Sequence, residues 1–322
     1  MPTRSLEHLP VTLFASVMGL GGMSLAWRRA VHTWEAPTWP ADVFLATASV
    51  VLVLLLVLYA AKWARHPAAA RAELRHPIRM TFAPTLTIAL LVVATAARDV
   101  APGAASALWW VGAVGHLVAT VAVLSAWFGR ADIGHGVVTP AWFIPVVGNV
   151  VTPLAARDLG SVELAWFAFG VGVVFWVALL PLVLQRLLLH DGGLPDKLLP
   201  TLAILIAPPA VAMLAWQSLT GEVGDPVGRI LYAAAMFFVI LLAVQFGRLR
   251  RVPFALPYWA YTFPLAAASA AAVTVAGSDA VSGVAYDVVA VLLLTASTVL
   301  VLVVATLTLH AAGRGQICVP EP

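Results

Sequence analysis

The stretch PFALPYWAYTFPLAAASAAAVTVA, residues 253–276, decides the fold that we expect for this chain. It carries no charged side chain, and it is long and apolar enough to cross a bilayer as a helix. Pro264 stands inside it, so the helix should kink near the membrane midplane, because proline lacks a backbone N–H and clashes with the preceding turn. At helical spacing Phe263 shares its face with alanines alone. Two interpretations stay open: a ring that plugs a narrow passage, or a phenylalanine packed between helices.

Composition indicates an all-α polytopic membrane protein. Of the 322 residues, 62% are hydrophobic and 10% are charged, whereas about a quarter are charged in soluble domains. The apolar segments are too long for the roughly ten-residue strands of a membrane β-barrel. We expect one transmembrane domain, 1–322, with ten spans. They run approximately over residues 9–27, 41–61, 78–97, 105–128, 137–156, 162–184, 198–217, 228–247, 253–276 and 284–309.

The positive charges predict the orientation of these spans. Of the 18 Lys and Arg residues, 13 lie at the chain ends or in the loops on the same side of the membrane, and 5 lie on the other side. The larger group is Arg4, Lys62, Arg65, Arg71, Arg75, Arg79, Arg130, Arg186, Lys197, Arg248, Arg250, Arg251 and Arg314. The smaller group is Arg28, Arg29, Arg98, Arg157 and Arg229. By the positive-inside rule both termini should be cytoplasmic, and we expect a multi-pass protein of a bacterial inner membrane.

Prolines alternate along the chain and predict the arrangement of the helices. Spans 3, 5, 7 and 9 contain Pro84; Pro140, Pro145 and Pro153; Pro200, Pro208 and Pro209; and Pro257 and Pro264. The first span has interior glycines instead, and among the even spans only the sixth has an interior proline, Pro181. An interrupted helix leaves backbone polar groups that lipid cannot satisfy. We therefore expect five helical hairpins, with an inner ring of five kinked helices around a central pore and the even helices facing lipid.

The pore that this arrangement predicts would be lined by small residues and helix breaks. Gly19 and Gly148 belong to the small inner faces, and Pro145 interrupts the fifth span. Where helices break near Pro208 and Pro264, free N–H groups should carry a positive partial charge that favours anions. No carboxylate lies within the odd spans, which favours a channel or uniporter over a tightly coupled symporter.

Three polar features each have two interpretations. Asn149, near mid-membrane on a pore-type helix, either touches a permeating ion or satisfies a carbonyl freed by Pro145. His116, near the centre of span 4, either relays protons or forms an interhelical hydrogen bond. The basic loop 62–79 either binds anionic lipid head groups or serves only to set the topology.

Enzymatic chemistry is not indicated. Cys318 is the one cysteine, so no intrachain disulfide and no Cys-based metal site can form. Zinc-protease, Walker and Cys-pair patterns are missing, as is any paired acid and base within the spans. We expect no catalytic residue, no metal, no cofactor and no nucleic acid partner.

Five stretches resemble the pore helices of the tellurite-resistance and C4-dicarboxylate transporter family. They are LPVTLFASVMGLGGMSLAWRRA at 9–30, RHPIRMTFAPTL at 75–86, TPAWFIPVVGNVV at 139–151, PTLAILIAPPAVAMLAW at 200–216 and PYWAYTFPLAAASA at 257–270. The family includes bacterial tellurite-resistance proteins, fungal malate and sulfite exporters and plant slow anion channels. The resemblance implies five hairpins around a pore closed by an aromatic plug, usually in a homotrimer, and the gating phenylalanine of its motif matches Phe263.

The resemblance also implies a function. We expect a channel or transporter that moves small inorganic or organic anions through a central pore gated by Phe263. The alternative is a proton-coupled exporter of C4-dicarboxylates such as malate, of sulfite or of tellurite on the same scaffold. Membrane lipid and identical subunits are the other partners that the resemblance implies.

Overall fold

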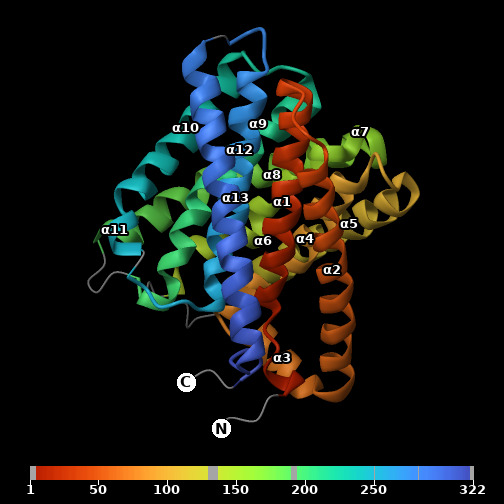
Figure 1. Cartoon of the computed structure of the whole chain (residues 1–322). Helices are drawn as coiled ribbons and strands as arrows, with labels where there is room; N and C mark the ends of the chain where they lie inside the picture. The colour runs from red at the N-terminus through yellow and green to blue at the C-terminus, as the bar shows by residue number, and fades with distance from the viewer. Residues whose placement is uncertain (1–4, 130–136, 190–193, 250, 282, 320–322) are drawn as a thin grey trace.

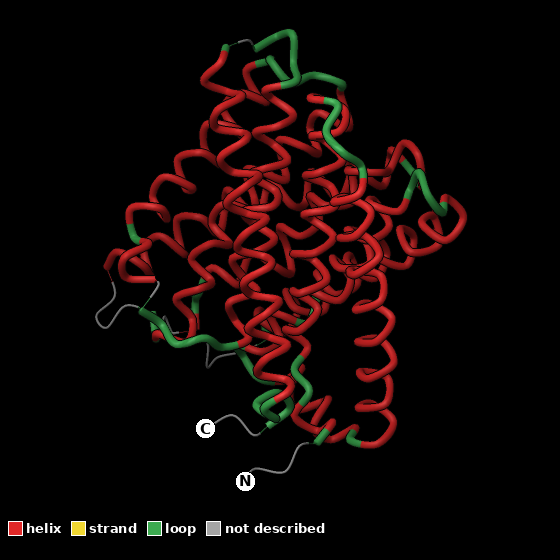
Figure 2. Tube along the Cα trace, in the orientation of Figure 1, coloured by secondary structure: helices red, strands yellow, loops and turns green. Residues whose placement is uncertain are grey.

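The computed structural model describes residues 5–129, 137–189, 194–249, 251–281 and 283–319, and all regular structure in these ranges is helical (Figures 1 and 2). The α-helices are α1 Phe14–Trp34, α2 Trp39–Arg65, α3 Pro67–Arg75, α4 Thr85–Ala97, α5 Pro102–Phe128, α6 Phe143–Val147, α7 Ala156–Leu159, α8 Val162–Leu189, α9 Ala207–Thr220, α10 Pro226–Val244, α11 Phe246–Leu249, α12 Thr262–Ala276 and α13 Val284–Gly313. The 3-10 helices are η1 Leu6–His8, η2 Val11–Leu13, η3 Arg79–Phe82, η5 Pro140–Trp142, η6 Gly148–Ala155, η7 Asp196–Ile206 and η8 Leu256–Tyr261. Arg4, Arg130 and Arg250 of the charge count lie outside the described residues.

Within the described residues, eight helical segments are long and apolar enough to cross a membrane. They are Trp39–Arg65, Arg79–Ala97, Pro102–Phe128, Val162–Leu189, Asp196–Thr220, Pro226–Val244, Leu256–Ala276 and Val284–Gly313. The predicted spans 9–27 and 137–156 are not among them. The first corresponds to η2 and part of α1, and the second is divided among η5, α6, η6 and α7.

Burial separates these eight segments into two classes. In the three that join a 3-10 helix to α4, α9 or α12, 72–89% of the most apolar window is buried inside the protein. In the other five, α2, α5, α8, α10 and α13, the buried share is 28–33%. The proline-bearing segments are thus enclosed by protein and the Leu- and Val-rich helices face outward, as the prolines predict for these eight spans. Pro181 lies inside α8 without ending it.

At both proline breaks that we named, near Pro208 and Pro264, the N–H of the junction residue is paired. At the junction of η7 and α9, Ala207 N–H donates to the Ile204 carbonyl. At the junction of η8 and α12, Thr262 N–H donates to the Trp259 carbonyl. The chain changes helix type there instead of unwinding, and Pro264 occupies the first turn of α12, where an N–H has no intrahelical partner in any case. These two N–H groups are therefore not among the free ones that the predicted positive partial charge requires.

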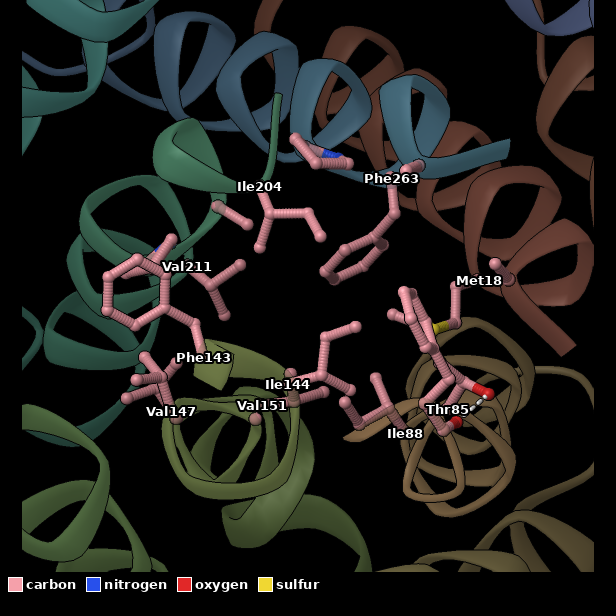
Figure 3. A pocket seen from close by; sticks show the side chains of 18 of the residues that line it. Met18, Thr85, Ile88, Phe143, Ile144, Val147, Val151, Ile204, Val211 and Phe263 are labelled. Atoms are coloured by element: carbon pink, nitrogen blue, oxygen red, sulfur yellow. Dashed lines mark hydrogen bonds between the residues drawn. The ribbon is translucent and has the colours of Figure 1, made fainter. Parts of the chain in front are cut away.

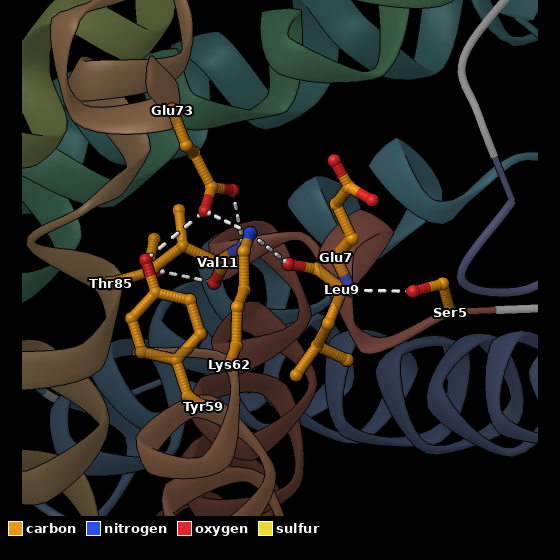
Figure 4. A network of polar contacts seen from close by, with 8 residues as sticks. All are labelled: Ser5, Glu7, Leu9, Val11, Tyr59, Lys62, Glu73 and Thr85. Carbon is orange, nitrogen blue, oxygen red and sulfur yellow. Dashed lines mark hydrogen bonds and ion pairs between the residues drawn. The ribbon is translucent and has the colours of Figure 1, made fainter. Parts of the chain in front are cut away.

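A buried ion pair joins the N-terminal segment to α2 and α3 (Figure 4). Lys62 Nζ lies 2.7 Å from Glu73 Oε2 and donates to the Leu9 carbonyl at 2.7 Å. Glu73 also accepts from Tyr59 Oη at 3.1 Å and from the Val11 N–H at 2.8 Å. The Lys62 and Glu73 side chains are 3% and 7% exposed, so each depends on the other for charge compensation.

This network reaches the centre of the protein and limits what the basic loop can do. Thr85 Oγ1, at the start of α4, lies 3.2 Å from the carbonyl oxygen of Val11, and the N–H of Val11 donates to Glu73. Lys62 is buried and paired, so it is unavailable to lipid head groups. The lipid-binding interpretation of the loop 62–79 therefore applies at most to its other basic residues.

We expect Lys62→Met to lower the free energy of unfolding by about 3–5 kcal/mol, because Glu73 would keep a buried charge without its partner. Thermal or denaturant unfolding of the purified protein in detergent measures this. Arg65→Met is the matched control: Arg65 lies on the same helix and is exposed, so a change within about 0.5 kcal/mol is expected. Equal effects of the two substitutions would contradict the importance of the ion pair.

Candidate functional site

A cavity of about 80 Å³ lies among α1, α4, α6, η6, α9 and α12 (Figure 3). Its lining includes Met18, Thr85, Ile88, Phe143, Ile144, Val147, Val151, Ile204, Val211 and Phe263. None of the lining residues is charged, and Thr85 donates its hydroxyl hydrogen to the Phe82 carbonyl. We name it the central cavity. Its walls offer an ion almost nothing to replace its water, so a hydrated ion meets a barrier here.

Phe263 projects from α12 into the central cavity, toward Ile204 and Ile144 (Figure 3). Its side chain is 8% exposed. On its other side the ring rests on α1, where a Cβ added at Gly22 would lie 3.2 Å from Phe263 Cδ2. One face of the ring therefore packs against α1, and the ring also fills part of the cavity. The two interpretations of Phe263 are compatible with each other.

The other predicted pore residues separate into two groups. Gly148, Pro208 and Pro264 line the central cavity together with Phe263. Gly19 and Pro145 are not among the lining residues. The space that a side chain at Gly19 would need is occupied by Thr262, so this glycine allows α1 and α12 to approach closely.

Asn149 is fully buried and does not line the central cavity. Its Nδ2 donates to the Val146 carbonyl and to Thr120 Oγ1, both at 2.8 Å. Thr120 Oγ1 in turn lies 2.7 Å from the Pro145 carbonyl. The amide is thus engaged with the backbone next to Pro145, directly at Val146 and through Thr120 on α5.

His116, on α5, forms an interhelical contact. Its Nδ1 lies 2.8 Å from Thr87 Oγ1 on α4, and Thr87 donates its single hydroxyl hydrogen to the Pro84 carbonyl. We infer that Nδ1 carries the hydrogen and donates to Thr87, which leaves Nε2 as an acceptor facing Gly148. Nε2 has no hydrogen-bond partner within the described part of the chain, so no proton path continues from it there.

Beyond the central cavity two adjoining polar cavities hold arginines that sequence reasoning did not connect. Their volumes are about 360 and 470 Å³, and both are lined by Arg29, Arg98, Leu154 and Gln217. Arg28 lines the first and Arg157 lines the second. One feature of the sequence could have pointed to them. All four arginines belong to the smaller group in the charge count, on the side of the membrane where the positive-inside rule disfavours positive charge.

The fold and the site define a polytopic helical membrane protein with an apolar cavity among its buried helices. Residues 8–309 match the family described as voltage-dependent anion channel, and the chain belongs to this family. The resemblance seen in the sequence is confirmed by the relatives, which include both plant slow anion channels and a bacterial tellurite-resistance protein.

Three relatives illustrate the range of similarity. The S-type anion channel SLAH2 of Arabidopsis thaliana is 29% identical, over 95% of this chain and 60% of its own length. The tellurite resistance protein TehA homolog of Haemophilus influenzae is 26% identical, over 96% of this chain and 92% of its own length. The guard cell S-type anion channel SLAC1 of Arabidopsis thaliana is 30% identical over 52% of this chain and 30% of its own length. The chain thus spans less than two thirds of these plant channels.

We expect Gly148→Ala to destabilise the protein by about 1–3 kcal/mol, because the added Cβ would lie 2.6 Å from both the His116 ring and Ile88 Cδ1. Unfolding in detergent measures the effect. The control is Gly170→Ala on α8, where a Cβ meets open space and alanine gains up to about 1 kcal/mol of helix propensity. If both variants unfold alike, the tight contact at Gly148 is not real.

Proposed function

We propose that this chain is an anion channel or facilitator whose ten segments form five hairpins in one transmembrane domain, 1–322. Contacts between successive segments support the hairpins: α1 packs on α2, α4 on α5, α6 and η6 on α8, α9 on α10, and α12 on α13. In each pair the first member contributes to the central cavity, and the second is one of the five outward-facing helices.

The inner ring of this proposal is supported by a closed series of contacts. α1 packs on α4, α4 on η6, η6 on α9, α9 on α12, and α12 on α1 again. The observation that carries the proposed function is that these same segments line one cavity. Side chains from a closed ring can surround an axial passage, which solid packing of the same helices would not leave.

Phe263 is the proposed gate of this passage. Its ring occupies the cavity, and the wall opposite consists of aliphatic side chains such as Ile144 and Val211 (Figure 3). A ring that turns about its side-chain torsions would widen an apolar constriction without breaking any hydrogen bond. Pro264 and Pro208 also line the cavity, and each lies in the first turn of an α-helix, next to the junction with the preceding 3-10 helix.

The substrate class of the proposal comes from the relatives, whose names specify anion channels and tellurite resistance. Small inorganic or organic anions are the proposed cargo. The His116 geometry favours a channel or facilitator over a proton-coupled exporter of malate, sulfite or tellurite, because its one hydrogen-bonded nitrogen is engaged with a neighbouring helix. A homotrimer in a bacterial inner membrane, with both termini cytoplasmic, completes the proposal.

We expect Phe263→Ala to raise nitrate or chloride flux at least tenfold in proteoliposomes, which corresponds to a barrier lowered by about 1.4 kcal/mol. The physical reason is that the ring fills an apolar constriction that alanine would leave open. Flux is measured under a fixed anion gradient, with reconstituted protein quantified for each variant. Phe167→Ala is the matched control, because Phe167 is 62% exposed on the outward-facing α8.

The outcomes separate the parts of the proposal. Unchanged flux in Phe263→Ala, with measurable flux in the wild type, would remove Phe263 from the gate. The absence of anion flux from both the wild type and Phe263→Ala would overturn the channel function itself.

A further inference from the structure

The polar cavity of about 360 Å³ continues the central cavity along the same helix faces. Leu25, Thr95 and Ala270 line it, and each follows by seven residues a residue that lines the central cavity. Seven residues are two turns, or about 10 Å along a helix axis. The displacement runs toward the end of α1 that is distant from both chain termini (Figure 1). We name the two adjoining polar cavities together the arginine vestibule.

Three of the four vestibule arginines already have partners. Arg28 Nη2 lies 3.0 Å from Asp42 Oδ1. Arg98 Nε lies 3.6 Å from a carboxylate oxygen of Asp99 and 3.6 Å from one of Asp158. The guanidinium of Arg157 donates to the carbonyls of Ser218 and Leu219. These last contacts satisfy carbonyls near the C-terminal end of α9, a common place for a cation.

Arg29 is different from the other three. Across the described ranges it has no carboxylate and no hydrogen-bond acceptor, although it lines both cavities of the vestibule. Arg98, which is also positive, lines the same two cavities. An unpaired guanidinium that is partly shielded from water beside another cation is unfavourable unless an anion visits it.

Two hydroxyl groups of the vestibule cannot take over this role. Thr95 donates its hydroxyl hydrogen to the Leu91 carbonyl, and Thr274 donates to the Ala270 carbonyl. Neither hydroxyl therefore has a hydrogen left to donate to an anion in the cavity. Gln217 lines both cavities, and its Oε1 is buried without a hydrogen-bond donor from the described residues.

We propose that Arg29 is the coordinating residue of an anion capture site in the vestibule, and that the site takes oxyanions in preference to halides. A guanidinium presents a planar fork of N–H donors that matches two oxygens of one anion, whereas a spherical halide uses a single point of contact. The vestibule is several times larger than the central cavity, so it admits an anion with part of its hydration shell. This inference rests on the proposed function, because it makes the vestibule the mouth of the same passage.

The test compares nitrate with chloride in two independent measurements. Binding is measured as the rise in unfolding temperature of the detergent-purified protein with anion concentration, and transport is measured as flux in proteoliposomes. We expect Arg29→Gln to raise the nitrate concentration that gives half of the maximal stabilisation at least tenfold. Arg29→Lys, which keeps the charge and the long side chain, should keep binding but lose the preference for nitrate over chloride.

Arg229→Gln is the matched control. It removes a positive charge from the same side of the membrane in the predicted topology, but Arg229 lies outside the vestibule lining and donates to the carbonyls of Gly224 and Ala280. We expect its nitrate response to equal that of the wild type. A general loss of surface charge would instead weaken nitrate binding in Arg229→Gln as much as in Arg29→Gln, and that result would overturn the site.

The remaining outcomes are equally decisive. Nitrate binding by Arg29→Gln at the wild-type concentration would overturn the site while leaving the channel function intact. Nitrate binding that Arg29→Gln abolishes, in a wild type that carries no flux, would support the site and overturn the channel function. Equal stabilisation of the wild type by nitrate and chloride would overturn the oxyanion preference. If Arg29→Gln does not fold, Arg29→Lys still tests that preference.

Discussion

The structure depends on one constraint: the polar backbone groups that proline and 3-10 geometry leave unsatisfied must find partners inside the protein, because lipid offers none. The region around Pro145 illustrates it. Pro145, with no N–H of its own, lies in α6, and its carbonyl is contacted by Thr120 from α5. Asn149 then bonds both Thr120 and the Val146 carbonyl. Such partners exist only where other helices surround the segment, so the interrupted segments are buried and regular helices remain outside.

The same constraint separates apolar and charged surfaces along the proposed passage. The buried segments meet around a cavity with no charged side chain, where the Phe263 ring lies. The arginines lie about two turns further along, where two larger polar cavities can hold water. The N–H groups of Ala207 and Thr262 at the helix junctions are paired, whereas the guanidiniums that line the two polar cavities present positive charge to an anion. In this account the arginines capture the anion at one depth of the passage, and Phe263 gates the passage at another.

The sequence predicted much of this arrangement, because prolines act locally and their burial follows from solvation. Phe263, Pro264, Pro208 and Gly148 could be placed near one cavity from the helix breaks alone. The positions of Gly19 and Asn149 could not, because each depends on which neighbour occupies the adjacent space. The pairing of Lys62 with Glu73 and the convergence of the vestibule arginines join segments far apart in the chain, and neither helical period nor composition encodes such a contact.

The central claim is that the interrupted segments face a water-accessible passage and the regular helices face lipid. Thiol accessibility in a bilayer tests it most directly, with Cys318→Ser as the background. Leu25→Cys on α1 and Leu214→Cys on α9 line the vestibule, whereas Ile240→Cys on α10 is 62% exposed on the outer surface. A charged, membrane-impermeant thiol reagent should modify the first two and leave the third unmodified. Modification of Ile240→Cys alone, with both vestibule cysteines protected, would contradict the account.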